Sequence, residues 1–235
     1  MPVSGRKPTG EIRAVLQGGL PLFMAGDTPL HDVIGRNPFF SAVKRALDIA
    51  VAAFLLILFA PLLLMAAAAI KVSAPGPVFQ VDEREGLKRR RFKLVRFRTT
   101  PASAGGHPQG SSCEAQITPL GRFLRSTGLD ELPQLFNVLI GDMSMVGPRA
   151  YAPGMRVGAR SYDELVPYYH LRHEVRPGLA GWAQVNGFRG HTKVGFGALE
   201  SIHYDIAYVQ NASLALDVKI IWRTFAREFM AGYGS

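Results

Sequence analysis

Residues 49–70 read IAVAAFLLILFAPLLLMAAAAI, and the interpretation of the whole chain starts from this stretch. Every residue in it is apolar or proline. About 20 apolar residues suffice for a helix to cross the hydrocarbon core of a bilayer. Helices in the core of a soluble domain are usually shorter and carry polar residues on one side. The stretch therefore predicts a helix that enters a membrane.

The charges that flank this stretch indicate how the helix meets the membrane. Lys44 and Arg45 precede it, and Lys71 follows it directly. A spanning helix carries its excess of basic residues on the cytoplasmic side alone. Because both flanks are basic here, we expect both to stay on the cytoplasmic side, with the charges of Lys44, Arg45 and Asp48 in the headgroup layer where the helix enters.

Pro61 supplies the bend that this topology needs. A proline inside a helix removes one hydrogen bond, and its ring clashes with the carbonyl four residues earlier, here that of Ile57. A kinked helix can enter and leave by one membrane face while most of its backbone polar groups stay satisfied. We therefore expect residues 39–71 to form a re-entrant membrane helix. A simple span and a buried core helix are the alternatives.

Composition narrows the partners of the chain. It has 235 residues, a net charge of +9 and a pI of about 10.0. Basic chains usually bind nucleic acid, anionic lipid or phosphorylated ligands. The apolar stretch favours the last two, so we expect membrane lipid and no nucleic acid as partners. The single cysteine, Cys113, excludes an internal disulfide, which suits a reducing compartment.

The chain divides into three predicted parts. Residues 1–38 are rich in glycine and proline and predict a flexible leader, residues 39–71 form the membrane helix, and residues 72–235 form a cytoplasmic globular domain. Sequence patterns in that domain predict two strands and then helices, at residues 78–81, 92–98, 121–126, 132–139, 162–173, 199–209 and 214–230. The fold class is therefore α+β and mostly helical. The last helix has an apolar and a basic face, so it either packs on the core or lies as an interfacial helix on the membrane.

An adjacent acidic pair, Asp130 and Glu131, carries the candidate chemistry. It precedes a helix whose first turn holds Pro133, so we expect Asp130 at or beside the N-cap, where an acidic residue also has a purely structural explanation. Carboxylates among arginines indicate a site for a metal and a phosphorylated ligand, because guanidinium groups bind phosphate through a planar fork. These arginines could alternatively form a solvated face; they are Arg96, Arg98, Arg122, Arg125 and Arg149. No P-loop, zinc-binding pattern or Gly-x-Ser-x-Gly elbow is present.

Four segments carry a longer pattern: KRALD at 44–48, FRT at 97–99, LRSTGLDELPQLFNVLIGDMSMVGPR at 124–149 and RPGLAGWAQVNG at 176–187. Together they resemble the bacterial sugar transferases, which are monotopic phosphoglycosyl transferases. The resemblance runs from about Lys44 to the C-terminus. It implies transfer of a hexose-1-phosphate from a UDP-sugar to undecaprenyl phosphate, the first membrane step of exopolysaccharide, capsule or O-antigen synthesis. It also implies Mg²⁺, a re-entrant helix, and the cytoplasmic face of the bacterial inner membrane.

The resemblance assigns roles to particular residues. Asp130 would attack the β-phosphate of the UDP-sugar, expel UMP and form a phosphosugar–aspartate intermediate, which the lipid phosphate then attacks. Glu131 would hold the metal together with Asp130 or assist the second attack. The implied phosphate contacts are Arg96, Arg98, Arg125 and Arg149.

Four positions depart from the usual pattern of the family. Arg96 stands where lysine is usual, Thr100 where methionine is usual, Ala150 where proline follows Gly-Pro-Arg, and Ala60 where serine precedes the kink proline. Arginine keeps the charge of lysine but changes the geometry of its contacts with phosphate. We expect a minimal form of the family, without the upstream membrane-spanning helices that some relatives carry.

The sequence leaves alternatives for the transferred sugar and for the functional class of the protein. The stretch WAQVNGFRG at residues 182–190 resembles members that transfer glucose-1-phosphate, with galactose second. A non-catalytic membrane adaptor that binds anionic lipid is the alternative function, and a nucleic-acid binder comes third. A homo-oligomer is compatible with the sequence.

Overall fold

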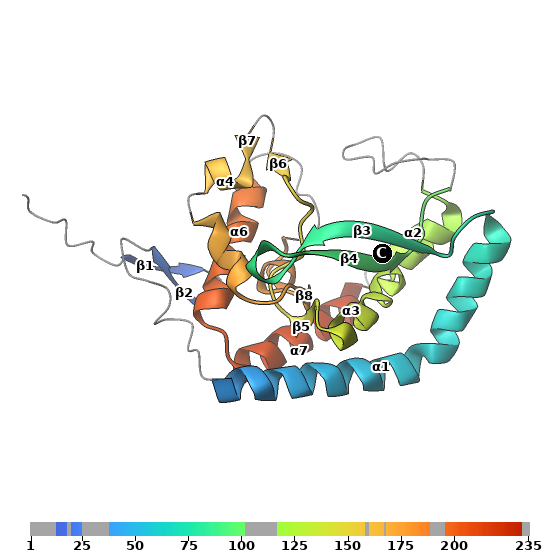
Figure 1. The fold of residues 1–235 in the computed structure, drawn as a ribbon, viewed down its shortest axis with the longest axis horizontal. Helices are drawn as coiled ribbons and strands as arrows, with labels where there is room; N and C mark the ends of the chain where they lie inside the picture. The colour runs from blue at the N-terminus through green and yellow to red at the C-terminus, as the bar shows by residue number, and fades with distance from the viewer. Residues whose placement is uncertain are drawn as a thin grey trace, which may run out of the picture.

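The computed structural model describes residues 13–17, 20–24, 38–101, 117–157, 160–166, 168–188 and 196–231. Cys113 lies outside these residues. Within the described residues the chain is mostly helical and has four two-stranded sheets, so the predicted α+β class is confirmed. Figure 1 shows the globular part on one side of a long, bent helix.

That long helix, α1, spans Pro38–Ser73 and contains the whole apolar stretch. Within the described residues it is the one helix long and apolar enough to cross a membrane. Figure 1 shows α1 running straight along one side of the molecule and then turning sharply. Pro61 is the proline inside this helix. It accounts for a bend because its ring cannot be accommodated in a straight hydrogen-bond ladder.

Both halves of α1 pack on the same globular domain. Ala52 belongs to a core cluster with Leu135 and Val138. Ile70 belongs to a second cluster with Phe97. A buried core helix is nevertheless excluded, because many apolar side chains of α1 are largely exposed, among them Phe54, Ile57, Leu58, Leu64 and Met65.

The elements after α1 begin with the two predicted strands, but within the described residues four further short strands, β5 to β8, lie among the helices that follow and were not predicted. In chain order they are β3 (Phe79–Glu85), the 3₁₀ turn η1 (Leu87–Arg89), β4 (Arg91–Phe97), α2 (Pro119–Ser126), the 3₁₀ turn η3 (Leu129–Glu131), α3 (Gln134–Ile140), β5 (Ser144–Val146), β6 (Arg156–Val157), β7 (Arg160–Ser161), α4 (Tyr162–Leu165), the 3₁₀ helix η4 (Tyr169–Glu174), β8 (Gly178–Ala180), α5 (Trp182–Val185), α6 (Phe196–Gln210) and α7 (Leu214–Ala231).

The antiparallel hairpin of β3 and β4 is the platform for the helices that follow it. Asn137 of α3 fixes that helix to β4: its Nδ2 donates to the carbonyl of Lys93 at 2.7 Å, and its Oδ1 accepts from the amide of Val95 at 3.1 Å. Buried side-chain amides satisfied in this way hold one relative orientation of two elements. The segment between β4 and α3 is therefore anchored at its C-terminal end.

A short parallel pairing of β5 with β8 joins two distant segments, with Ser144 opposite Gly178 and Val146 opposite Ala180. Glycine is required in this contact, since a Cβ on Gly178 would lie 2.0 Å from the amide nitrogen of Gly147. The Gly-Pro-Arg and Arg-Pro-Gly sequences thus meet side by side.

The hairpin β1 (Arg13–Gln17) and β2 (Leu20–Met24) lies within the predicted leader and pairs antiparallel. The division into a flexible leader, a membrane helix and a globular domain stays a prediction. The bounds of α1 differ from the predicted segment by one residue at the start and two at the end.

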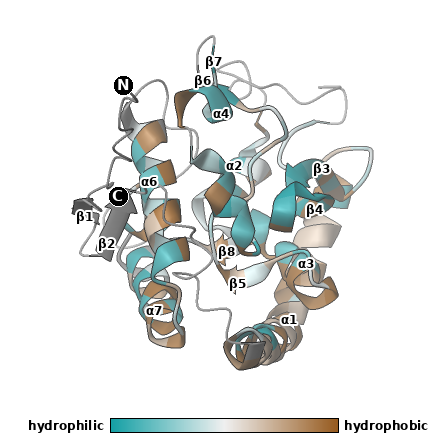
Figure 2. Cartoon of the chain, turned by 60° about the vertical axis from the view of Figure 1, so that its left-hand side comes forward, coloured by the Kyte–Doolittle hydropathy of each residue, from teal (hydrophilic) through white to brown (hydrophobic). Residues whose placement is uncertain are grey.

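The last helix, α7, places its apolar face on the surface. Leu216 and Ile220 are buried, whereas Val218, Trp222 and Phe225 are exposed, Trp222 by 70%. The alternative in which that apolar face packs on the core is therefore wrong. Figure 2 shows apolar residues of α1, α3 and α7 at the lower end of the molecule.

Two further expectations are corrected. The helix predicted at 162–173 is interrupted between α4 and η4, because Val166, which precedes Pro167 in the sequence, is extended. Asp130 does not cap the helix after it. It lies in η3, whereas α3 begins only after Pro133, which occupies its N-cap position.

Candidate active site

The acidic pair lies in the tight turn η3 between α2 and α3. Gly128 precedes this turn with φ +69°, a conformation that favours glycine. Leu129 of the turn packs against a cluster formed by Ala66 and Ile70 of α1 together with Phe97 and Leu124. Asp130 therefore directly follows a residue of the apolar cluster to which the second half of α1 contributes.

Asp130 is a buried carboxylate, 7% exposed. Burial, and secondly the neighbouring charge of Glu131, raise the pKa of Asp130 to about 6, although Arg96 and Arg125 act in the opposite direction. The pKa still lies below neutral pH, so the group is mostly ionised there. A weakly solvated carboxylate of this kind is the form in which an aspartate acts as a nucleophile.

Arg149 faces the acidic pair from the loop that follows β5. Its Nη2 donates to Oε1 of Glu131 at 3.1 Å, and the charge of Glu131 raises the pKa of Arg149. The pairing of β5 with β8 continues into this loop, because the amide of Gly147 donates to the carbonyl of Ala180 and that of Gly178 to the carbonyl of Pro148.

A buried arginine supports the same loop from behind. Nη2 of Arg172 donates to the carbonyl of Arg149 at 2.5 Å and to Oδ2 of Asp205 at 2.7 Å. Its guanidinium lies 4.0 Å from the ring centroid of Tyr151. Arg172 and Asp205 are both nearly inaccessible to solvent, so removal of either would leave a buried charge without its partner.

The hairpin adds a group that the sequence analysis missed. Asp82 of β3 forms an ion pair with Arg96 of β4, and its Oδ2 lies 3.4 Å from Nη2 of Arg84. Arg96 in turn acts electrostatically on Asp130. Alternation along β3 could have indicated that positions 82 and 84 share one face of the hairpin. The sequence alone does not show that this face is the one beside the acidic pair.

The structure places the other two predicted phosphate contacts, Arg125 and Arg98, in different surroundings. Arg125 lies close enough to act on the charge of Asp130, and its Nε donates to Oγ1 of Thr99 at 2.9 Å. Arg98 is buried and donates to the carbonyls of Pro75 and Ala74 at 2.7 and 2.8 Å, beyond the end of α1. The structure thus brings Arg96, Arg125 and Arg149 to the acidic pair, while Arg98 holds the chain that leaves the apolar helix. A phosphate contact by Arg98 stays a prediction.

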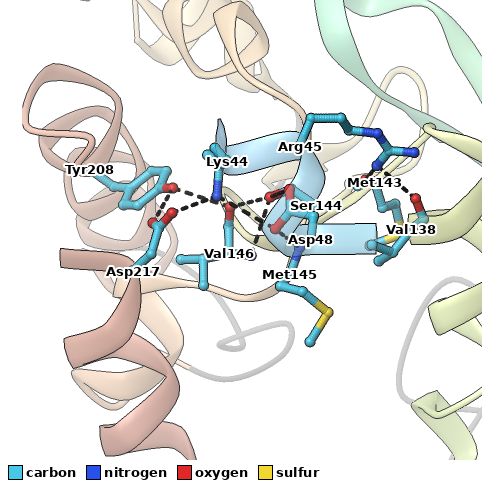
Figure 3. A network of polar contacts seen from close by, with 10 residues as sticks. All are labelled: Lys44, Arg45, Asp48, Val138, Met143, Ser144, Met145, Val146, Tyr208 and Asp217. Carbon is cyan, nitrogen blue, oxygen red and sulfur yellow. Dashed lines mark hydrogen bonds and ion pairs between the residues drawn. The ribbon is translucent and has the colours of Figure 1, made fainter. Parts of the chain in front are cut away.

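The charged residues at the start of the apolar helix join it to the globular domain (Figure 3). Lys44 donates to Asp217 of α7 at 2.6 Å, and the carboxylate of Asp48 accepts from the hydroxyl of Ser144 at 2.7 Å. Arg45 donates to two carbonyls in the last turn of α3, at 2.7 and 3.1 Å, where the helix dipole favours a cation. A role of these side chains and of Pro61 in membrane insertion stays a prediction.

The acidic pair could hold a divalent cation only if substrate phosphates or water supplied the remaining ligands. In the described part of the chain no group of three His, Cys, Asp or Glu side chains could hold a metal. Mg²⁺ is commonly bound by one or two carboxylates, substrate phosphates and water. A cation bound here would relieve the repulsion between Asp130 and Glu131, so the chemistry of these two oxygen donors is compatible with Mg²⁺.

Comparison with known proteins shows the family to which the chain belongs. The chain matches the family model described as bacterial sugar transferase over residues 39–231. It is 44% identical over 195 residues to the exopolysaccharide production protein PSS of Rhizobium leguminosarum bv. phaseoli, covering 82% of this chain and 98% of that protein.

The names of two longer relatives state their substrates. The UDP-glucose:undecaprenyl-phosphate glucose-1-phosphate transferase of Klebsiella pneumoniae is 40% identical over 214 residues, 90% of this chain and 44% of that protein. The UDP-N-acetylgalactosamine-undecaprenyl-phosphate N-acetylgalactosaminephosphotransferase of Aeromonas hydrophila is 37% identical over 201 residues, 85% of this chain and 46% of that protein. The chain thus spans less than half of either. The resemblance seen in the sequence is confirmed, and the chain belongs to the bacterial sugar transferase family.

Proposed function

We propose that this protein transfers a hexose-1-phosphate, first of all glucose-1-phosphate, from a UDP-sugar to undecaprenyl phosphate and releases UMP. The observation that carries the proposal is a buried carboxylate, Asp130, that lies among arginines in a turn packed against a cluster to which the long apolar helix contributes. The name of the Klebsiella relative supports glucose, whereas that of the Aeromonas relative shows that the family also accommodates an N-acetylated sugar. We keep galactose as the second sugar to test.

In the first half of the proposed reaction, the carboxylate of Asp130 attacks the β-phosphorus of the UDP-sugar. The bond from that phosphorus to the bridging oxygen breaks, and the oxygen leaves with UMP. The sugar phosphate is then bonded to Asp130 as an acyl phosphate, a mixed anhydride. In the second half, an oxygen of undecaprenyl phosphate attacks the same phosphorus and releases the carboxylate. A covalent intermediate of this kind divides one difficult transfer into two easier steps.

The surrounding charges suit the phosphates of this reaction. Arg96, Arg125 and Arg149 offer guanidinium donors to phosphate oxygens, which accumulate negative charge in the transition state. Glu131 holds Arg149 in place before substrate binds. Mg²⁺, held by Asp130 and Glu131 together with the diphosphate, would neutralise charge on the diphosphate and so favour both attack and departure.

We further propose that α1 enters the cytoplasmic leaflet of the inner membrane and returns on the same side. Two contacts support this topology. Lys44, before the apolar stretch, is bound to Asp217 of α7, and the carbonyls of Ala74 and Pro75, after it, are bound by Arg98. Because one domain holds both ends, a straight span would have to break one of these attachments. The exposed apolar residues of α7 would lie in the interface beside α1.

A non-catalytic adaptor for anionic lipid is the second candidate. The observation in its favour is the turn η1, in which Lys88 and Arg89 are exposed and are followed by the exposed Arg90 and Arg91. Such a cluster attracts anionic headgroups whether or not the protein is an enzyme.

The test is transfer of labelled sugar phosphate from UDP-glucose to undecaprenyl phosphate by the purified full-length chain, together with release of UMP. Without acceptor, the intact mass of the wild-type protein should increase by one hexose phosphate. Asp130→Asn should show neither the adduct nor turnover. Asp163→Asn changes an exposed carboxylate outside the site and should match the wild type. A protein that binds anionic vesicles but releases no UMP from any UDP-sugar would support the adaptor instead.

A further inference from the structure

Asp82 is a buried carboxylate that the proposed reaction does not use directly. It lies in the middle of β3 and is 1% exposed. Ionised side chains are rarely buried to this degree unless they are paired. Oδ1 of Asp82 accepts from Nε2 of Gln80 at 3.0 Å, and Oδ2 faces the guanidinium groups of Arg84 and Arg96.

Asp82 offsets a repulsion that the fold would otherwise contain. Arg84 and Arg96 are both mostly buried, and burial together with the charge of Arg96 lowers the pKa of Arg84. Burial by itself would raise the pKa of Asp82, but Arg96, Gln80 and Arg84 together hold that pKa below the usual value. The carboxylate therefore stays ionised at neutral pH and keeps two like charges close together.

This arrangement of buried charges lowers the stability of the folded protein. The Nε–H groups of Arg84 and Arg96 are buried and have no hydrogen-bond partner among the described residues. Each such donor lowers the stability of the folded protein. A packed apolar pair could occupy this part of the hairpin without that cost. Costs of this kind are typical of functional sites.

Arg96 is the link between this group and the acidic pair, since it pairs with Asp82 and also acts electrostatically on Asp130. We infer that Asp82 is a positioning residue: it holds the guanidinium of Arg96 at the side of Asp130, where it can meet a substrate phosphate, and prevents it from pairing with the nucleophile itself. This inference rests on the proposed transfer reaction. Asp82 contacts no substrate, and its effect passes through Arg96.

The first test is Asp82→Asn, which keeps the shape of the side chain and removes its charge. Arg96 would then be free to pair with Asp130, so kcat for UMP release should fall by about 100-fold, the scale expected when a catalytic group is misplaced by about 1 Å. KM for UDP-glucose should change by less than about 3-fold, because the loss is one of orientation in the transition state. Glu83→Gln is the matched control, since Glu83 is the next residue of β3 but is exposed and faces Arg91. It should leave both constants unchanged.

A double-mutant cycle separates positioning from a general structural role. Arg96→Gln should lower kcat to a similar extent, and the double variant D82N/R96Q should be no slower than R96Q, because Asp82 has then nothing left to position. Melting temperatures are measured in parallel. If D82N alone does not fold, the comparison of R96Q with the double variant, which lacks both charges of the pair, still decides the question.

Provided that the wild-type protein is active, three results would overturn the inference. The first is a kcat of D82N within about 3-fold of the wild-type value, and the second is a D82N defect that is confined to KM. The third is a double variant in which the effects of the two substitutions multiply. A wild-type protein that releases no UMP would instead refute the proposed function, and the inference would fall with it. The two failures are thus distinguishable.

Discussion

Replacement of Asp130 by asparagine should abolish turnover and at the same time make the protein more stable at neutral and higher pH. Asp130 has a reference pKa of 3.8 in the unfolded chain and a pKa of about 6 in the folded protein. A difference of about two units corresponds to about 3 kcal/mol, by which the folded state is penalised once the group is ionised in both states. The residue is buried, so solvent does not weaken this penalty appreciably.

The sign of the effect follows from proton binding. The folded protein holds the proton of Asp130 more tightly than the unfolded chain does, so this group lowers stability as pH rises from about 4 to about 6. The amide that replaces the carboxylate in D130N would carry no charge at any pH. The difference in melting temperature between D130N and the wild type should therefore be small near pH 4 and grow to about 6–12 °C near pH 8, using about 2–4 °C per kcal/mol for a chain of this size.

Thermal unfolding in detergent measures this directly, with both proteins free of nucleotide and Mg²⁺ and scanned at several pH values. Asp163→Asn serves as the control, because Asp163 is exposed and pairs with Arg89 at the surface. Its difference from the wild type should stay near zero throughout. A D130N protein that is less stable than the wild type near pH 8, or a difference that does not depend on pH, would refute the reasoning.

Four further outcomes are expected. Gly178→Ala should lower the melting temperature and the activity together, because its Cβ would lie 2.0 Å from the amide nitrogen of Gly147 in the loop that carries the Gly-Pro-Arg sequence; full activity would contradict this. Asp48→Ala should cost about 1–3 kcal/mol in thermal unfolding, since it leaves the buried amide of Met145 without its acceptor, whereas the hydroxyl of Ser144 can still donate to the carbonyl of Val146. EDTA should stop UMP release and added Mg²⁺ should restore it, whereas turnover in EDTA would remove the metal from the mechanism. Gly5→Cys in a Cys113→Ser background should not react with an impermeant thiol reagent applied to intact cells, and labelling from outside would exclude re-entry.

The sequence predicted those features that depend on local pattern. An uncharged run of this length predicts α1, and Pro61 predicts its bend, because both effects act within a few residues. Sequence patterns likewise predicted the two strands that form β3 and β4, although β3 extends to Glu85, beyond the predicted segment at 78–81. Asp130 and Glu131 could be singled out because the acidic pair, the following proline and the arginines form a recognisable family pattern.

The sequence could not predict which charges face one another. Asp82 and Arg96 are 14 residues apart, and Arg96 is close enough to act on the charge of Asp130 in a fold where Asn137 fixes α3 to β4. Arg98 belongs to the same strand region as Arg96 but is directed to the chain beyond α1. Proximity in sequence gave these two arginines the same predicted role, and the tertiary structure separates them.

The amphipathic pattern of α7 illustrates the same limit. Its sequence shows that one face is apolar, but a core and a membrane interface select for the same pattern. The structure shows that Asp217 and Ile220 are buried while Trp222 and Phe225 are exposed, and a place for that exposed face in the membrane interface stays a prediction. The sequence by itself thus determined the apolar helix, its bend and the acidic pair, since these follow from short-range chemistry. Only the tertiary structure decided which arginines reach that pair and which helix face meets the solvent, because both depend on contacts between segments that are distant along the chain.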